Sequence, residues 1–190
     1  TLHARLKALG NRPERGVSMS LAFSPDAERE LERLVHRYPN RRAAVIPALI
    51  LADREFGYLS REAMEYVAKR LEVPPSWVMG SATFYTMLRK RPTGKHHIQV
   101  CVNVACYLRG ADQLGAHLKK RLGIGFGEVT PDGLFSLEGV QCLAACGTAP
   151  VLRVNDAYHE DMTIEKADAL IESLRRAPEG APSPGPGGGR

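Results

Sequence analysis

Four cysteines constrain the fold of this 190-residue chain more than any other residues do. They form two close pairs, spaced C-x4-C and C-x3-C, with 35 residues between the pairs, and they are Cys101, Cys106, Cys142 and Cys146. Because every cysteine falls in one of the two pairs, the sequence predicts a single four-thiolate site that the fold closes. Thiolates are soft ligands, and four of them suit either zinc or an iron–sulfur cluster.

The cysteine spacing favours an iron–sulfur cluster over the other uses of four cysteines. Structural zinc sites typically contain a C-x2-C knuckle, and neither pair has that spacing. A thioredoxin-type dithiol site would need C-x-x-C, which is absent. Two disulfides are disfavoured because no secretory signal is visible. Zinc and disulfides remain as alternatives on the spacing alone.

Charge and hydropathy argue against nucleic-acid binding and membrane insertion. The net charge is +5, but residues 1–18 carry four of the basic residues against Glu14 alone, so the body of the chain is nearly balanced. No aromatic platform for stacking bases accompanies the basic residues. The longest apolar run, residues 43–52, is far shorter than the roughly 18 residues that indicate a membrane span.

Composition and periodicity divide the chain into four parts. Residues 1–20 are predicted to be a flexible basic leader, and the Pro/Gly-rich residues 178–190 a disordered tail. Helical periodicity dominates residues 21–90, which we expect to form a helical bundle. Residues 91–177 change to a mixed pattern of strands and helices that carries all four cysteines.

The first half predicts four helices. Ser24-Pro25 opens the first and Ser60 caps the third, since a serine hydroxyl accepts a free amide at a helix start. A buried second helix is expected at residues 41–55, and Pro74-Pro75 starts a short fourth one. The aromatic residues of this last region, namely Trp77, Phe84 and Tyr85, are expected in the bundle core.

The second half predicts a small sheet with helices. Alternating apolar residues from Ile98 onward indicate a strand. A helix is expected at residues 110–122, and strands at 134–137, 139–141 and 151–154. Thr163 caps a last helix. The order of strand, helix, hairpin and helix resembles the thioredoxin-like arrangement, so the fold class expected is α+β, a helical bundle followed by a thioredoxin-like α/β domain.

Both cysteine pairs are expected on loops at strand ends. Cys101 ends the first strand and Cys106 opens the loop into the next helix, while Cys142 and Cys146 bracket a later loop. Free backbone amides there can donate hydrogen bonds to sulfur and tune a reduction potential. His96 and His97 precede the first strand and could in principle join a mixed site. Four cysteines already complete the coordination, so both are interpreted as ordinary strand residues.

Longer motifs make the chain similar to a known family. It resembles the thioredoxin-like 2Fe-2S family that includes the E subunit of bacterial respiratory complex I. The motifs run through most of residues 24–176, and they are residues 78–85 (VMGSATFY), 92–95 (PTGK) leading to Cys101, 106–110 (CYLRG), 129–135 (VTPDGLF), 142–146 (CLAAC), 149–150 (AP), 154–158 (VNDAY) and 161–163 (DMT).

The resemblance implies a subunit of an NADH-oxidising module. In such modules a partner flavoprotein subunit binds NADH and FMN, and a 2Fe-2S cluster, here on Cys101, Cys106, Cys142 and Cys146, exchanges single electrons with the FMN. No residue of this chain would act as acid, base or nucleophile, because the cofactors carry the chemistry. Residues 21–90 would dock on the flavoprotein. The assembly would be NADH:quinone oxidoreductase, peripheral to the cytoplasmic face of the membrane.

The resemblance also leaves other assemblies open. NAD-reducing hydrogenases and NAD-dependent formate dehydrogenases use an equivalent small subunit. A free ferredoxin-like carrier or a zinc-stabilised binding module is an alternative of another class, although a free carrier would not need the helical extension.

Two residues beside the cysteines depart from the pattern common in the family. Gln141 stands where an acidic residue often precedes the third cysteine, and Ala144 stands where glycine often follows it. The loss of a negative charge at Gln141 predicts a raised cluster potential.

Overall fold

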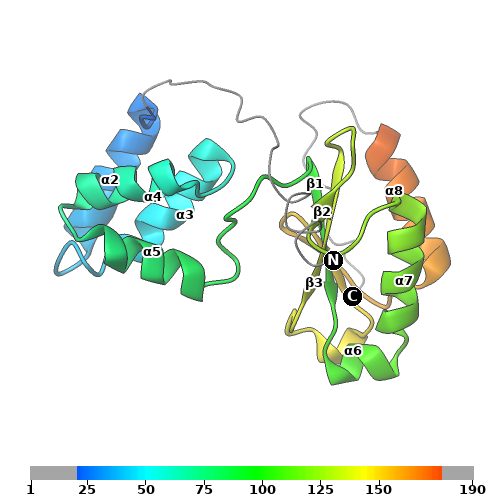
Figure 1. Ribbon diagram of the computed structural model, residues 1–190. Helices are drawn as coiled ribbons and strands as arrows, with labels where there is room; N and C mark the ends of the chain where they lie inside the picture. The colour runs from blue at the N-terminus through cyan, green and yellow to red at the C-terminus, as the bar shows by residue number, and fades with distance from the viewer. Residues whose placement is uncertain (1–20, 177–190) are drawn as a thin grey trace, which may run out of the picture. The chain divides into compact units, whose positions relative to one another are not determined.

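The computed structural model describes residues 21–176, and the chain divides after Leu88 into two compact units (Figure 1). The first unit is helical, and the second holds a five-stranded sheet with helices. This is the α+β class that the sequence predicts. The leader at residues 1–20 and the tail at 178–190 lie outside the described residues, so their predicted character stays a prediction. Among the described helices, none has the length and apolarity that a membrane crossing requires.

Four helices make up the first unit: α2 (Pro25–Arg37), α3 (Val45–Phe56), α4 (Arg61–Leu71) and α5 (Pro75–Phe84). The hydroxyl of Ser24 accepts the backbone N–H of Ala27 at 3.3 Å, and that of Ser60 accepts the N–H of Ala63 at 3.1 Å. Each bond satisfies an amide that has no partner inside its helix, which is why α2 and α4 begin where the sequence predicts.

Helix α3 begins later than expected. Residues 41–44 form turns, and the helix runs from Val45. Pro47 therefore lies in the first turn, where a missing N–H costs no intrahelical hydrogen bond. Gly57 ends the helix at φ +81, a left-handed conformation that glycine adopts without strain.

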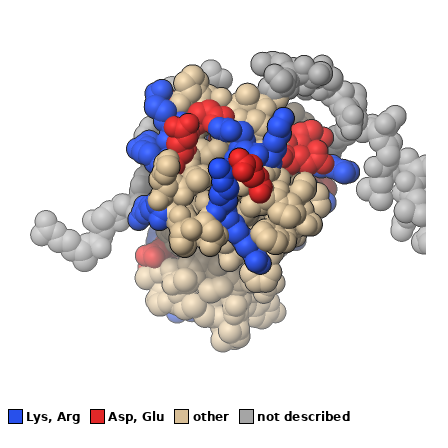
Figure 2. Space-filling model, turned by 90° about the vertical axis from the view of Figure 1, so that its left-hand side faces the viewer, with Lys and Arg blue, Asp and Glu red and all other residues tan. Residues whose placement is uncertain are grey.

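A polar contact joins α2 to α4 above the apolar core of the first unit. The Tyr66 hydroxyl donates to the Glu28 carboxylate at 2.7 Å and accepts the N–H of Phe23 at 3.1 Å. Arg70 also donates to Glu28, and this hydrogen bond is the main cause of the lowered pKa of the Glu28 carboxyl. On the outside of the unit, charges of both signs are interspersed (Figure 2).

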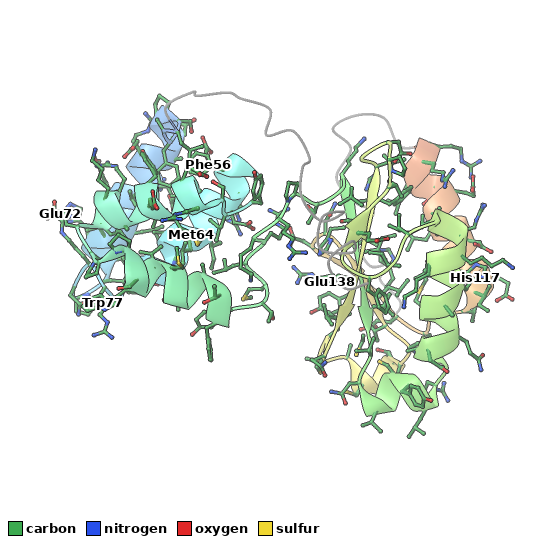
Figure 3. All side chains as sticks on the ribbon, in the orientation of Figure 1. Phe56, Met64, Glu72, Trp77, His117 and Glu138 are labelled. Carbon is green, nitrogen blue, oxygen red and sulfur yellow. The ribbon has the colours of Figure 1, made fainter. Side chains whose placement is uncertain are left out.

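Helix α5 contradicts one expectation from the sequence. Val78 and Ala82 fill the core, whereas Trp77, Phe84 and Tyr85 are 43%, 76% and 36% exposed. The helix is apolar around its whole circumference, so the sequence pattern does not tell which side is buried. Figure 3 shows Trp77 at the outer edge of the unit.

The second unit is built on a sheet of strand order β2-β3-β1-β4-β5. The strands are β1 (His96–Cys101), β2 (Glu128–Val129), β3 (Phe135–Val140), β4 (Leu152–Val154) and β5 (Ala157–His159). Strands β1 and β3 are parallel, with His96 opposite Phe135 and Cys101 opposite Val140. The other neighbours are antiparallel. The two strands expected at 134–137 and 139–141 are thus a single strand.

Helices α7 (Ala111–Leu122) and α8 (Ile164–Arg176) cover one face of the sheet (Figure 1). Their apolar sides pack on Ile98, Val100 and Leu137. His117 of α7 and Asp168 of α8 are 2.9 Å apart across the helix pair. Figure 3 shows His117 on this helical layer and Glu138 on the opposite side of the sheet.

Candidate metal centre

Both cysteine pairs lie where parallel strands β1 and β3 end. Cys101 is the last residue of β1, and Cys142 follows two residues after Val140, the last residue of β3. Carboxyl ends of neighbouring parallel strands meet at one edge of a sheet, the edge at which open α/β sheets bind ligands. The parallel register therefore brings two cysteine loops together that are far apart in the sequence.

The first loop contains a short helix that the sequence analysis missed. Cys106 lies inside α6 (Val104–Leu108), so the prediction of a loop at Cys106 was wrong. The Asn103 side chain accepts the N–H of Val104 at 2.7 Å and caps this helix. Asparagine before an apolar segment is a helix-start signal, and it was the available clue. The helix turns the Cys106 side chain inward, where it is 1% exposed.

The second loop holds Cys142 and Cys146 in an irregular turn. The backbone N–H of Ala144 donates to Sγ of Cys142 at 3.2 Å, which is the kind of amide–sulfur bond expected from the sequence. Ala144 has φ +57, a left-handed conformation that is uncommon outside glycine. Cys146 then begins the 3-10 turn η1 (Cys146–Thr148).

Backbone contacts hold the two loops against each other. The N–H of Cys101 donates to the carbonyl oxygen of Val151 at 3.2 Å. Arg109, just after α6, donates from Nε to the carbonyl oxygen of Ala149 at 3.4 Å. A small apolar cluster surrounds the inner cysteines, formed by Ala111, Leu143, Ala149 and Val151.

The thiols interact across this cluster. Burial raises the pKa of Cys106 to about 11, and a hydrogen bond with Cys101 and the proximity of Cys146 act in the same direction. The thiols on α6, β1 and η1 are therefore close enough to influence one another. A thiol that coordinates a metal ion is deprotonated by the charge of the ion, so binding there would release protons.

The four cysteines differ sharply in exposure. Cys101 and Cys106 are buried, at 2% and 1%, whereas Cys142 and Cys146 are exposed. The candidate centre therefore has an inner pair shielded by the fold and an outer pair at the surface.

The donor set fits a binuclear cluster. Within residues 21–176, no three His, Cys, Asp or Glu side chains are arranged around one point as ligands of a single metal ion. A 2Fe-2S cluster takes two thiolates on each of its two irons, so it needs two pairs of cysteines rather than three donors at one point. The inner and outer pairs supply that chemistry.

His96 and His97 lie at the beginning of β1, the end opposite Cys101. Five residues of extended chain separate His96 from Cys101 by about 16 Å. His97 instead contacts the Ser136 hydroxyl at 2.8 Å and the Glu138 carboxylate at 3.0 Å on the sheet face without helices. That hydrogen bond is the main cause of the lowered pKa of Glu138.

Comparison with known proteins gives one family. The family model of the thioredoxin-like 2Fe-2S ferredoxins matches residues 31–175. The match therefore spans parts of both compact units and includes all four cysteines.

Curated relatives match over most of the chain. It is 47% identical over 148 residues to the second E subunit of the NADH-quinone oxidoreductase of Rhizobium meliloti, with 78% of this chain and 88% of that protein covered. It is 44% identical over 158 residues to NADH-quinone oxidoreductase subunit 2 of Thermus thermophilus, with 82% and 87% covered.

Among solved structures, a chain of an NAD+-reducing NiFe-hydrogenase in the H2-reduced state matches with a TM-score of 0.60 and 22% identity. The match covers 68% of this chain and 22% of that one. At this level of identity the similarity shows the fold alone.

Proposed function

The chain belongs to the thioredoxin-like 2Fe-2S ferredoxin family, and from this premise we propose that it is an electron-transfer subunit of an NADH:quinone oxidoreductase. Cys101, Cys106, Cys142 and Cys146 would hold a 2Fe-2S cluster. The observation that carries the proposal is the meeting of both cysteine pairs at one edge of the β1–β3 pair. Two relatives named as subunits of this enzyme support the choice of assembly.

The residues around the cysteines would hold and shield the cluster. When bound, the cluster supplies one-electron oxidation and reduction. The inner cysteines and the apolar side chain of Leu143 keep water from one side. On the other side, the Ala144 N–H donates to a ligand sulfur, and such bonds raise a cluster's potential by stabilising the added negative charge.

The flavin chemistry would belong to a partner. We propose that a flavoprotein subunit binds FMN and NADH, and that the cluster exchanges single electrons with that FMN. The helical unit at residues 21–88 would dock in the assembly through the exposed side of α5, where Phe84 is 76% and Met87 64% exposed. Large exposed apolar side chains that gather on one element mark interaction surfaces. The proposed location is the peripheral arm on the cytoplasmic face of the membrane.

Spectroscopy with metal analysis tests the cluster. The full chain, purified anaerobically, is expected to contain two irons and two sulfides and to give an EPR signal on reduction with dithionite. Cys101→Ser and Cys142→Ser should each lose iron, and Ser173→Cys on α8 should not gain any. A colourless, EPR-silent protein with one zinc would overturn electron transfer and make the cysteines a structural clamp.

Co-purification tests the assembly. Co-expression with the flavoprotein, quinone-site and hydrogenase or formate dehydrogenase subunits of the same organism is expected to yield a complex with NADH:quinone reductase activity. Recovery with a hydrogenase or formate dehydrogenase instead would transfer the same role to that assembly. A chain that carries a cluster but associates with none of them would be a free carrier.

A further inference from the structure

The surface around the outer cysteines has the character of a permanent interface. We propose that α6 and the adjoining cysteine loop form an uncharged apolar docking surface for the FMN-binding subunit, with Val104, Tyr107 and Leu108 at its centre. This inference rests on the proposed function, and it adds which side of the second unit the partner covers and by what kind of contact.

Helix α6 presents its apolar side chains outward. Val104, Tyr107 and Leu108 are 66%, 58% and 78% exposed, and Val102 just before the helix is 40% exposed. The only residue of α6 that is buried is Cys106. A five-residue helix with a thiol inside and large apolar side chains outside is inverted relative to an ordinary amphipathic surface helix. Something other than this unit must cover those side chains.

The outer cysteines belong to the same end of the unit. The N–H of Val102 donates to the carbonyl oxygen of Val140 at 2.9 Å, so the start of the α6 loop adjoins the start of the Cys142 loop. Arg109 bonds the end of α6 to Ala149, beside η1. Figure 1 shows α6 next to the yellow segment that contains Cys142 and Cys146, at the lower end of the sheet.

This end of the unit is free of charged side chains in both loops. No Asp, Glu, Lys or Arg occurs in residues 96–108 or in residues 139–152. The lower end of the molecule in Figure 2 is accordingly almost uniformly tan. The two segments are interrupted in this respect only at their borders, by Lys95, Arg109, Glu138 and Arg153.

The absence of charge identifies the kind of partner. Transient electron-transfer encounters are small and rely on complementary charges that steer diffusion. An uncharged surface provides no such steering. The cores of permanent interfaces are apolar, rich in aromatic residues and depleted of charge, which matches Tyr107, Leu108 and Val104. The occupant is therefore a subunit with its own charge-poor apolar surface, bound permanently over the exposed cysteine pair.

Binding of the full chain to the purified FMN-binding subunit tests this surface. Leu108→Glu and Val104→Glu are expected to weaken the association at least about 30-fold, the effect of losing one central interface residue. Leu108→Met should bind like the wild type, and Ala169→Glu, which adds the same charge on the exposed side of α8, should also bind normally. The iron content and EPR signal of each isolated variant should stay unchanged, since the substituted side chains are exposed. Wild-type affinity should change little between low and high salt.

Each other result overturns the surface. Normal binding of both Leu108→Glu and Val104→Glu would place the partner elsewhere and leave the proposed function standing. Affinity that falls steeply with salt would show a charge-steered contact. An isolated wild-type chain that sediments as a dimer, and as a monomer with Leu108→Glu, would make a second copy the occupant. If the wild type does not bind the FMN-binding subunit at all, the proposed function falls together with this surface.

Discussion

The backbone N–H of Ala144 points at Sγ of Cys142, 3.2 Å away, and it does so from a left-handed backbone conformation with φ +57. A residue with a Cβ atom is strained there by about 1–2 kcal/mol. This geometry explains why glycine is common at this position in the family that the chain resembles. The hydrogen bond to a ligand sulfur is thus retained here at a cost in backbone strain.

Ala144→Gly is expected to stabilise the isolated chain. The substitution removes the strain but increases the freedom of the unfolded chain, so the net gain should be about 0.5–1 kcal/mol. Thermal or denaturant unfolding under anaerobic conditions measures it. Ala145→Gly is the control, since Ala145 has φ −119 and gains no relief, so this variant should lose stability. Equal effects of the two substitutions would show that strain at Ala144 is absent.

Gln141→Glu is expected to lower the cluster potential. The added negative charge lies next to a ligand and opposes reduction, and an exposed charge a few ångströms away contributes on the order of 1 kcal/mol, about 40 mV for one electron. Redox titration followed by EPR measures the shift. Ser173→Glu adds the same charge near the far end of α8 and should leave the potential almost unchanged. A potential in Gln141→Glu equal to or above that of the wild type contradicts the prediction.

Gly94→Ala is expected to destabilise the second unit by about 2–4 kcal/mol, because a Cβ atom there meets backbone that cannot move freely. An added Cβ would lie 2.4 Å from the carbonyl carbon of Phe135 in β3. Gly80→Ala is the matched control, since a Cβ there has nothing within 4 Å and α5 should gain up to about 1 kcal/mol in helix propensity. Unfolding of the isolated full chain compares the two, and similar stabilities would refute the close approach.

His96 is expected to make the protein less stable in acid. The ring is buried, and neither nitrogen finds a hydrogen-bond partner among the residues that the structure describes. Burial, and then the charge of Lys95, lower the pKa of His96 below its ordinary value. Below pH of about 6.5 the unfolded chain therefore binds a proton that the folded chain rejects, so stability falls as pH falls toward the lowered pKa.

His96→Phe removes this dependence. The variant should be about 1 kcal/mol more stable at pH 7, because an unpartnered buried polar group is replaced by an apolar ring. Its advantage should grow as the pH is lowered from 7 to 5. Unfolding of wild type and variant across this range measures the difference, and His36→Gln controls for loss of an exposed histidine. A constant difference at all pH values would show that His96 does not titrate differently on folding.

Local signals predicted the helical unit well, and the sheet less well. Ser24 and Ser60 cap helices where the sequence places them, because a cap depends on adjacent residues only. Strand β3 was expected as two strands because Gly139 interrupts it. In the structure a Cβ at Gly139 would lie 3.1 Å from the ring of Phe126, so the glycine admits a neighbouring side chain and does not end the strand.

The candidate centre was predictable in its ligands but not in its shape. Cysteine spacing identifies the four residues, since spacing is a property of the chain. The division into a buried and an exposed pair depends on the parallel pairing of β1 with β3 and on α6, and neither leaves a periodic signal in the sequence. Strands β2 and β5 have only two and three residues, too few to show alternation.

The placement of the two cysteine pairs on separate loops has a consequence for the chain as a polymer. A group shared by both pairs closes residues 107–141, with α7, β2 and β3, into a covalent ring. By the loop-closure relation used for disulfides, a ring of this size removes conformational entropy from the unfolded chain worth about 4 kcal/mol. Cofactor insertion would then act as a fastener for the sheet, and a chain that lost its iron would be exposed to proteolysis first within α7.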